Sequence, residues 1–218
     1  MTTRIVVVSA GLSTPSSTRL LADLLGEAAV AAVASRGAEV ELEHVELRGL
    51  AHDLTDHLLT SFPSAALRSA IDAVRHADGV IAVTPVFSAS YSGLFKTFFD
   101  VLELGVLDGK PVVLAATAGT ARHSLVLDHA LRPLFSYLHA IAVPTGVFAA
   151  TEDFAGGPEL AKRVERAAGE LAALVAPGGG APAEADRREL VEDVLAHPTD
   201  FETLLRRASD PLGSSRAD

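Results

Sequence analysis

Apolar residues gather along the chain in five short runs, which lie at about residues 4–9, 39–45, 80–84, 112–117 and 140–148. Runs of this length, bounded by turn residues, are typical of β-strands, and an unbroken apolar run fits a strand that is buried on both faces. The second run differs because its apolar and polar residues alternate, as they do in a strand near a sheet edge. The pattern therefore predicts five strands, with the second towards an edge.

The segments between these runs carry the periodicity of amphipathic helices. We expect helices at about residues 17–36, 65–76, 92–102, 123–139 and 159–175, whereas residues 46–64 look irregular. Strands and helices thus alternate five times, which predicts an α/β, doubly wound, three-layer sandwich with a parallel sheet. Five strands in about 175 residues suit the flavodoxin-like strand order 2-1-3-4-5.

A segment rich in glycine and proline, residues 177–182, divides the chain. We expect one domain, residues 1–176, followed by a linker and a helical C-terminal extension, residues 177–218. Within this extension, residues 183–196 and 201–208 are amphipathic, and the last few residues are expected to be disordered.

The composition excludes several kinds of chemistry. The 218 residues include no cysteine, which rules out disulfides, thiolate zinc sites, thiol catalysis and cysteine-ligated iron–sulfur clusters. A net charge of −10 is unlike the basic surface of a nucleic-acid-binding protein. No apolar run approaches the ~20 residues of a membrane span, and the first residues lack a signal-peptide pattern. We therefore expect a cytoplasmic protein with no nucleic acid and no membrane as partners.

A loop of glycine and hydroxylated residues follows the first strand, next to the switch point of the predicted sheet. Backbone N–H groups at a helix start, with hydroxyls around them, form an anion site. The residues that supply this chemistry are Gly11, Ser13, Ser16, Ser17 and Thr18. The loop is not a P-loop and carries no Gly-x-Gly-x-x-Gly fingerprint. Serine and threonine before a helix also serve as ordinary N-caps, but the position after the first strand favours a phosphate cradle.

Two further loops follow the third and fourth strands, so the expected topology brings all three loops to one edge of the sheet. Residues 85–88 and 117–120 are apolar and hydroxylic and contain no general base. Such loops suit a planar heteroaromatic ring that is contacted by backbone amides and hydroxyls. Each loop on its own also fits a plain strand exit or a glycine turn.

Residues 84–100 resemble the flavin-loop segment of the NADPH-dependent FMN reductases. That family typically has Pro-x-Tyr-x-x-Ser-x-x-Gly-x-(Leu/Phe)-Lys-x-x-(Ile/Phe)-Asp, and this chain matches it from Pro85 to Asp100, with Phe87 where the family often has tyrosine. Residues 116–124 with 131–134 are similar to its second signature. The resemblance covers about residues 3–176, and its nearest branch is the actinobacterial type, near the flavin reductases that partner two-component monooxygenases.

The resemblance implies an NAD(P)H-dependent FMN reductase that passes a hydride directly from NADPH or NADH to FMN, with no acid–base pair. It places three groups of residues against FMN. The phosphate and ribityl chain would contact Ser9, Gly11, Ser13, Ser16, Ser17 and Thr18. The ring would contact Pro85, Val86, Phe87 and Ser88 on one edge, and Thr117, Ala118, Gly119 and Thr120 on the other. A flavin-dependent monooxygenase would be one acceptor of the reduced flavin.

Several residues outside these loops have more than one interpretation. Arg122 and His123 follow the third loop and could bind the 2′-phosphate of NADPH, or form an ordinary wet helix start. Lys96 stands four residues before Asp100, a spacing that favours an ion pair. The histidines and aspartates of residues 52–57 are better explained as surface residues than as metal ligands. The stripe Phe95, Phe98, Phe99 and Leu102 suits either core packing or, as in the family, a helix at the interface of a homodimer or homotetramer.

The sequence leaves alternatives of other functional classes open. A quinone or azo reductase would share the fold and the cofactor. A flavodoxin-type electron carrier often covers FMN with tryptophan or tyrosine, whereas this chain has no tryptophan and two tyrosines. A flavin-free α/β scaffold is the third alternative.

Overall fold

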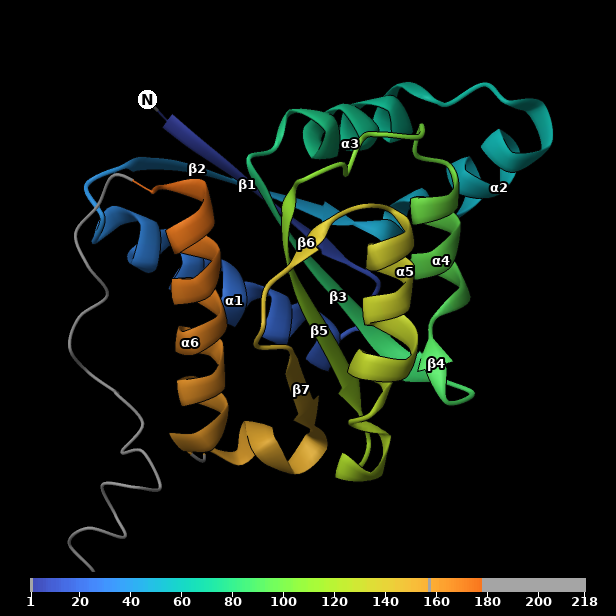
Figure 1. Cartoon of the computed structure of the whole chain (residues 1–218). Helices are drawn as coiled ribbons and strands as arrows, with labels where there is room; N and C mark the ends of the chain where they lie inside the picture. The colour runs from blue at the N-terminus through green and yellow to red at the C-terminus, as the bar shows by residue number, and fades with distance from the viewer. Residues whose placement is uncertain (1, 157, 178–218) are drawn as a thin grey trace, which may run out of the picture. The chain divides into compact units, whose positions relative to one another are not determined.

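The computed structural model describes residues 2–156 and 158–177, which form a parallel sheet with helices on both faces (Figure 1). The sheet has the order β2-β1-β3-β5-β6. Its strands are β1 (Thr2–Ser9), β2 (Glu39–Glu46), β3 (Gly79–Phe87), β5 (Pro111–Ala118) and β6 (Ile141–Ala142), with β7 (Val147–Ala150) also on β5 and β4 (Ser90–Tyr91) antiparallel to β3. The predicted fold class and the order 2-1-3-4-5 are confirmed, with β6 and β7 in place of one fifth strand.

Each central strand contributes to two cores, which explains its unbroken apolar sequence. In β1, Ile5 and Val7 face the core under α1 (Ser17–Ala34) and α6 (Pro158–Val175), whereas Val6 and Val8 face the opposite core. The helices over that opposite face are α2 (Ala51–Thr60), α3 (Ala65–His76), α4 (Gly93–Asp100) and α5 (Arg132–Tyr137) (Figure 1). Side chains alternate between the faces of a strand, so only an apolar run satisfies both cores.

Residues 46–64, expected to be irregular, are mostly helical. They contain the 3₁₀ turn η1 (Leu47–Leu50) and then α2. Leu47 and Leu54 are fully buried at a spacing of seven residues, so this segment has a buried helical face, but a narrow one. The polar residues between them masked this period in the sequence. Within the described residues, no group of three or more histidine, aspartate or glutamate side chains is placed to hold a metal.

Two predicted elements are divided in the structure. The expected strand at 140–148 is interrupted at residues 143–146, where Pro144 has no N–H to donate to a ladder. The expected helix at 123–139 consists of the 3₁₀ turn η2 (Ala121–His123), the π turn η3 (Leu127–Leu131) and α5. η3 runs directly into α5, and Pro133 lies in the first turn of α5, where it has no N–H to donate to the residues of η3.

The phenylalanine stripe on α4 lies in the core, which is the first of the two interpretations that the sequence allowed. Phe95, Phe98 and Phe99 are at most 1% exposed and pack together with Phe135 of α5. The helix ends at Asp100, so Leu102 lies beyond it. On the outer side of α4, Lys96 and Asp100 form the expected ion pair at 2.5 Å.

The expected linker and C-terminal helices, residues 178–218, lie outside the described residues, so the domain division at 176 stays a prediction. In the described part, no helix is long and apolar enough to cross a membrane.

Candidate functional site at the carboxyl edge of the sheet

The three loops singled out in the sequence meet at the carboxyl ends of the parallel strands. The hydroxyls of Thr18, in the first turn of α1, and Thr117, near the end of β5, are hydrogen bonded at 2.8 Å, and both residues are buried. Pro85 of β3 pairs with Thr117 in the sheet register, and the N–H of Ala10 donates to the carbonyl of Val83 at 3.0 Å. These contacts join the loops after β1, β3 and β5.

The loop after β1 presents unpaired backbone donors. Ser16 is the N-cap of α1, and its side chain accepts a hydrogen bond from the N–H of Arg19. Within the described part of the chain, no acceptor is found for the N–H groups of residues 11–14 or 16–18. An added Cβ at Gly11 would lie 2.1 Å from Ser16 Oγ, so a larger residue there would displace the hydroxyl that caps α1. The loop therefore fits a phosphate that needs several N–H and hydroxyl donors.

Two arginines lie at this loop. Arg19 of α1 is bound by Asp23, at 2.7 Å, and by Glu46. Burial, together with the Arg19 guanidinium, lowers the pKa of the adjacent His44, and Asp23 opposes that shift. Arg48 of η1 donates to the hydroxyl of Thr14 in the middle of the loop. Because carboxylates already engage Arg19, Arg48 is the cation better placed to face an incoming anion.

The segment after β3 is a hairpin, which corrects the expectation that the strand ends at Pro85. β3 continues through Pro85 to Phe87 and turns back into β4. Ser88 and Ala89 form the turn with φ of 49° and 66°, a conformation that favours glycine or asparagine. Strained turns of this kind gather at functional sites. Phe87 is 47% exposed at its base.

The base of the hairpin is fixed by Thr84. Its hydroxyl accepts a hydrogen bond from the N–H of Ser92 at 3.0 Å, and Ser92 is in turn the N-cap of α4. Both residues are buried. The buried end of β3 therefore holds the start of α4, and the exposed tip of the hairpin extends beyond both.

A groove of about 310 Å³ opens beside this hairpin. Its walls are Ala89 and Ser90 of the hairpin and, opposite them, the segment 122–130. Arg122 and His123 of η2 line it, and so does His129 of η3. π turns such as η3 are frequent at functional sites. The groove and the β1 loop share one edge of the sheet, so a ligand in the loop would lie near the hairpin and the groove.

The comparisons with known proteins agree with this geometry. The model of the family described as NADPH-dependent FMN reductase matches residues 3–155. The chain belongs to the NADPH-dependent FMN reductase family. The matched span contains β1, the hairpin and the groove, and so includes all three loops of the candidate site. Members of this family are oxidoreductases, and the resemblance noted in the sequence is confirmed.

Two relatives within the family have names that state different nicotinamide nucleotides, NADPH in one and NADH in the other. An FMN reductase (NADPH) of Pseudomonas aeruginosa is 40% identical over 153 residues, 69% of this chain and 78% of that protein. An NADH-dependent FMN reductase, SfnF, of Pseudomonas fluorescens is also 40% identical, over 70% of this chain and 79% of that protein. The crystal structure of an oxidoreductase from Corynebacterium diphtheriae is 54% identical, with a TM-score of 0.78, and the match covers 81% of this chain and 98% of that one.

Against the family's expected FMN contacts, the structure sorts the predicted residues into open and buried sets. Those with exposed or half-buried positions at this edge are Gly11, Ser13, Ser16, Ser17, Pro85, Val86, Phe87, Ser88, Ala118, Gly119 and Thr120. Ser9, Thr18 and Thr117 are buried, and the last two satisfy each other. Sequence reasoning missed Arg48 and His129. No local motif marks either residue, because each reaches the site through the tertiary fold.

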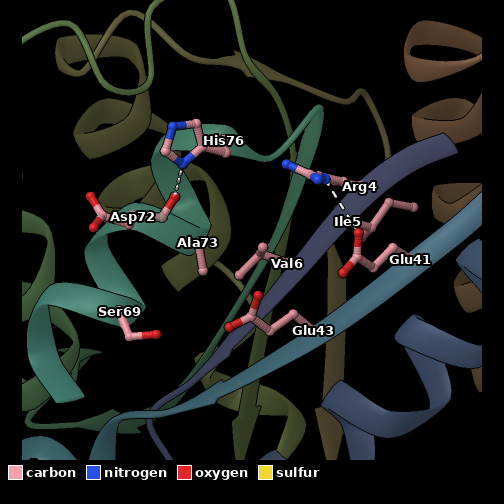
Figure 2. Close-up of a pocket in the computed structure, with 9 residues that line it drawn as sticks. All are labelled: Arg4, Ile5, Val6, Glu41, Glu43, Ser69, Asp72, Ala73 and His76. Carbon is pink, nitrogen blue, oxygen red and sulfur yellow. Dashed lines mark hydrogen bonds and ion pairs between the residues drawn. The ribbon is translucent and has the colours of Figure 1, made fainter. Parts of the chain in front are cut away.

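Another cavity, of about 290 Å³, lies away from this edge (Figure 2). It lies between α3 and the first halves of β1 and β2. Arg4 and Glu41, which line it, form an ion pair at 3.2 Å, and His76 is bonded to the backbone carbonyl of Asp72 at 2.8 Å. Its position towards the amino ends of the strands separates it from the family's flavin loops, and we assign it no role in the reductase site.

Proposed function

We propose that this chain is an NAD(P)H-dependent FMN reductase, which transfers a hydride from NADPH or NADH to FMN. The observation that carries the proposal is the start of α1, where backbone N–H groups lack acceptors within the described residues and lie behind a hydroxylated loop. Such a start, at the switch point of an open parallel sheet, suits a phosphate monoester. The two Pseudomonas relatives named above support the chemical identity, since both are named FMN reductases.

In this proposal the residues of the site divide their roles by loop. The FMN phosphate and ribityl chain contact the β1 loop, through Ser9, Gly11, Ser13, Ser16 and Ser17. The ring lies between residues 85–88 of the hairpin and residues 118–120. Thr18 and Thr117 connect the two regions through their hydrogen bond, so we assign them a positioning role ahead of direct contact.

FMN, when bound, supplies the ring that accepts the hydride. The chain's own residues then bind and orient the FMN and the nucleotide. The hydride transfer requires no acid or base from them. Phe87 is half exposed at the base of the hairpin, and the chain has no tryptophan to cover a flavin face. An uncovered face favours access by a nicotinamide ring over the role of an electron carrier.

Flavin titration tests the proposal. We expect FMN to bind at least about tenfold more tightly than FAD, because only one phosphate cradle is proposed. The measurement is quenching of flavin fluorescence, followed by oxidation of NADPH and NADH in the presence of FMN. Tighter FAD binding would contradict the cradle. FMN binding without nucleotide oxidation would favour the electron carrier, and absence of flavin binding would favour the scaffold.

A second prediction concerns Arg48. Because the Arg48 guanidinium donates to Thr14 in the loop, Arg48→Gln should weaken FMN binding about tenfold, which corresponds to the lower end of the range of about 1.5–3 kcal/mol for hydrogen bonds to charged groups. Riboflavin, which lacks the phosphate, should lose less than twofold. Arg68→Gln on the exposed face of α3 removes the same charge and serves as the control. Equal losses for FMN and riboflavin would mean that Arg48 only supports the loop.

The finer features of the function stay predictions from the sequence: a cytoplasmic location, a homodimer or homotetramer, and supply of reduced flavin to a flavin-dependent monooxygenase. An assembly would need a surface other than the buried stripe of α4. A quinone or azo reductase remains the alternative enzyme, and it would differ in its electron acceptor rather than in the flavin site.

A further inference from the structure

The groove beside the hairpin is cationic in a chain whose net charge is −10. Arg122, His123 and His129 line it, and none of the residues that line it carries a carboxylate. Within the described residues these three side chains have no hydrogen-bond or ion-pair partner. The nearest acid in sequence, Asp128, is bound to Arg132 at 2.8 Å. The groove therefore offers free donors to an anion.

The same groove has an apolar wall. Leu125, which is 61% exposed, and the buried Val126 both line the groove, on the segment that carries the three basic residues. Exposed leucines in such a position provide contact area for a flat ring. A volume of about 310 Å³ is at the lower end of small-molecule sites, enough for part of a dinucleotide but not for all of it.

We propose that this groove binds the adenosine half of NADPH, with Arg122, His123 and His129 around its 2′-phosphate and Leu125 against the adenine. The inference rests on the proposed function and deepens it, because it commits the chain to NADPH over NADH. Arginine offers the bidentate donor geometry that suits a phosphate. An imidazole donates an N–H in its neutral form and two in its charged form, so both histidines contribute in either state.

The hairpin makes this groove continuous with the flavin site. Ser88 belongs to the proposed flavin loop, and the adjacent Ala89 and Ser90 line the groove. A dinucleotide whose adenosine half lies in the groove would therefore have its nicotinamide half beside the ring region. His129 thus becomes a specificity-determining residue, which the sequence alone did not indicate.

The first test measures binding without turnover. Adenosine 2′,5′-bisphosphate and 5′-AMP differ by the 2′-phosphate, and calorimetric titration compares their affinities for the full chain. We expect the bisphosphate to bind about tenfold more tightly, and Arg122→Ala to remove most of this difference. Arg68→Ala, on the exposed face of α3, makes the same charge change elsewhere and should retain it. Equal affinities in the unsubstituted chain would overturn the assignment.

The second test measures kcat/KM for NADPH and NADH at saturating FMN, one pH and one ionic strength. We expect NADPH to be preferred, and Arg122→Ala to reduce kcat/KM about tenfold more for NADPH than for NADH. His129→Gln should reduce the preference about threefold, and His129→Lys, which supplies an N–H donor with a positive charge, should restore it. His52→Gln on the exposed side of α2 is the matched control.

Together, the two tests distinguish a failure of the groove assignment from a failure of the proposed reductase function. A chain that binds the bisphosphate through Arg122 but oxidises neither nucleotide with FMN would support the groove and contradict the reductase. A working reductase with equal preference for both nucleotides, or with equal losses for both in Arg122→Ala, would overturn the groove and leave the reductase intact.

Discussion

Ser17→Asp should lower the affinity for FMN at least about 100-fold while the fold survives. Ser17 is the first residue of α1, exposed, among backbone N–H groups that have no acceptor in the described residues. A carboxylate there would lie close to the FMN phosphate. Two unit charges 4 Å apart at an effective dielectric of 20 interact by about 4 kcal/mol, which corresponds to nearly three orders of magnitude in affinity. Salt screening reduces this figure, which sets the lower bound of about 100-fold.

The same substitution should not harm the helix. A carboxylate in the first turn interacts favourably with the helix dipole, so the melting temperature of Ser17→Asp should equal or exceed that of the unsubstituted chain. Ser17→Asn is the neutral isostere and should keep most of the affinity. Ala65→Asp is the matched control, because Ala65 is the first residue of α3 behind another serine N-cap. FMN affinity unchanged in a folded Ser17→Asp variant would remove the β1 loop from the site.

The elements of the fold that could be predicted are those whose structure is determined by their own local sequence. Each central strand must satisfy two cores, as Ile5 and Val6 do on opposite faces of β1, so its apolar run is continuous and readable. The alternation of such runs with helices then leaves few topologies. The short or half-polar elements were harder. α2 buries only Leu54 among its own residues, and the hairpin passes through Pro85, a residue that normally signals the end of a strand.

The candidate site likewise has a part that could be predicted from the sequence and a part that could not. Its three loops could be predicted because each follows a strand directly, and the topology of a parallel sheet brings such loops together. Arg48 could not be predicted, because it reaches Thr14 across 34 residues of sequence. His129 depends on the path of η3 relative to the hairpin. The burial of Thr18 and Thr117 is likewise a tertiary property, since their hydroxyls come from residues 99 positions apart.

The phenylalanine stripe of α4 shows why a pattern of apolar residues does not by itself tell core from interface. Both environments select the same residues, and the distinction depends on what covers the helix. Here α5 covers it: Phe99 lies 4.7 Å from Phe95 and 4.9 Å from Phe135, between ring centroids. Any subunit contact must therefore use other residues, such as Leu59 and Phe62, which are 80% and 81% exposed.

Phe99→Ala should therefore reduce the free energy of unfolding by about 3–5 kcal/mol, the range for removing a buried phenylalanine. Its ring is 1% exposed and makes contacts with three other aromatic rings, which add to the loss from burial alone. Urea denaturation measures the change. Phe62→Ala is the matched control, because the same atoms are removed from an exposed ring, and it should change stability by less than about 0.5 kcal/mol. Loss of stability with unchanged sedimentation is the result that the packing of Phe99 against Phe135 of α5 requires. A Phe99→Ala chain that unfolds as the unsubstituted chain does, but sediments as a smaller species, would instead place this ring at a subunit interface.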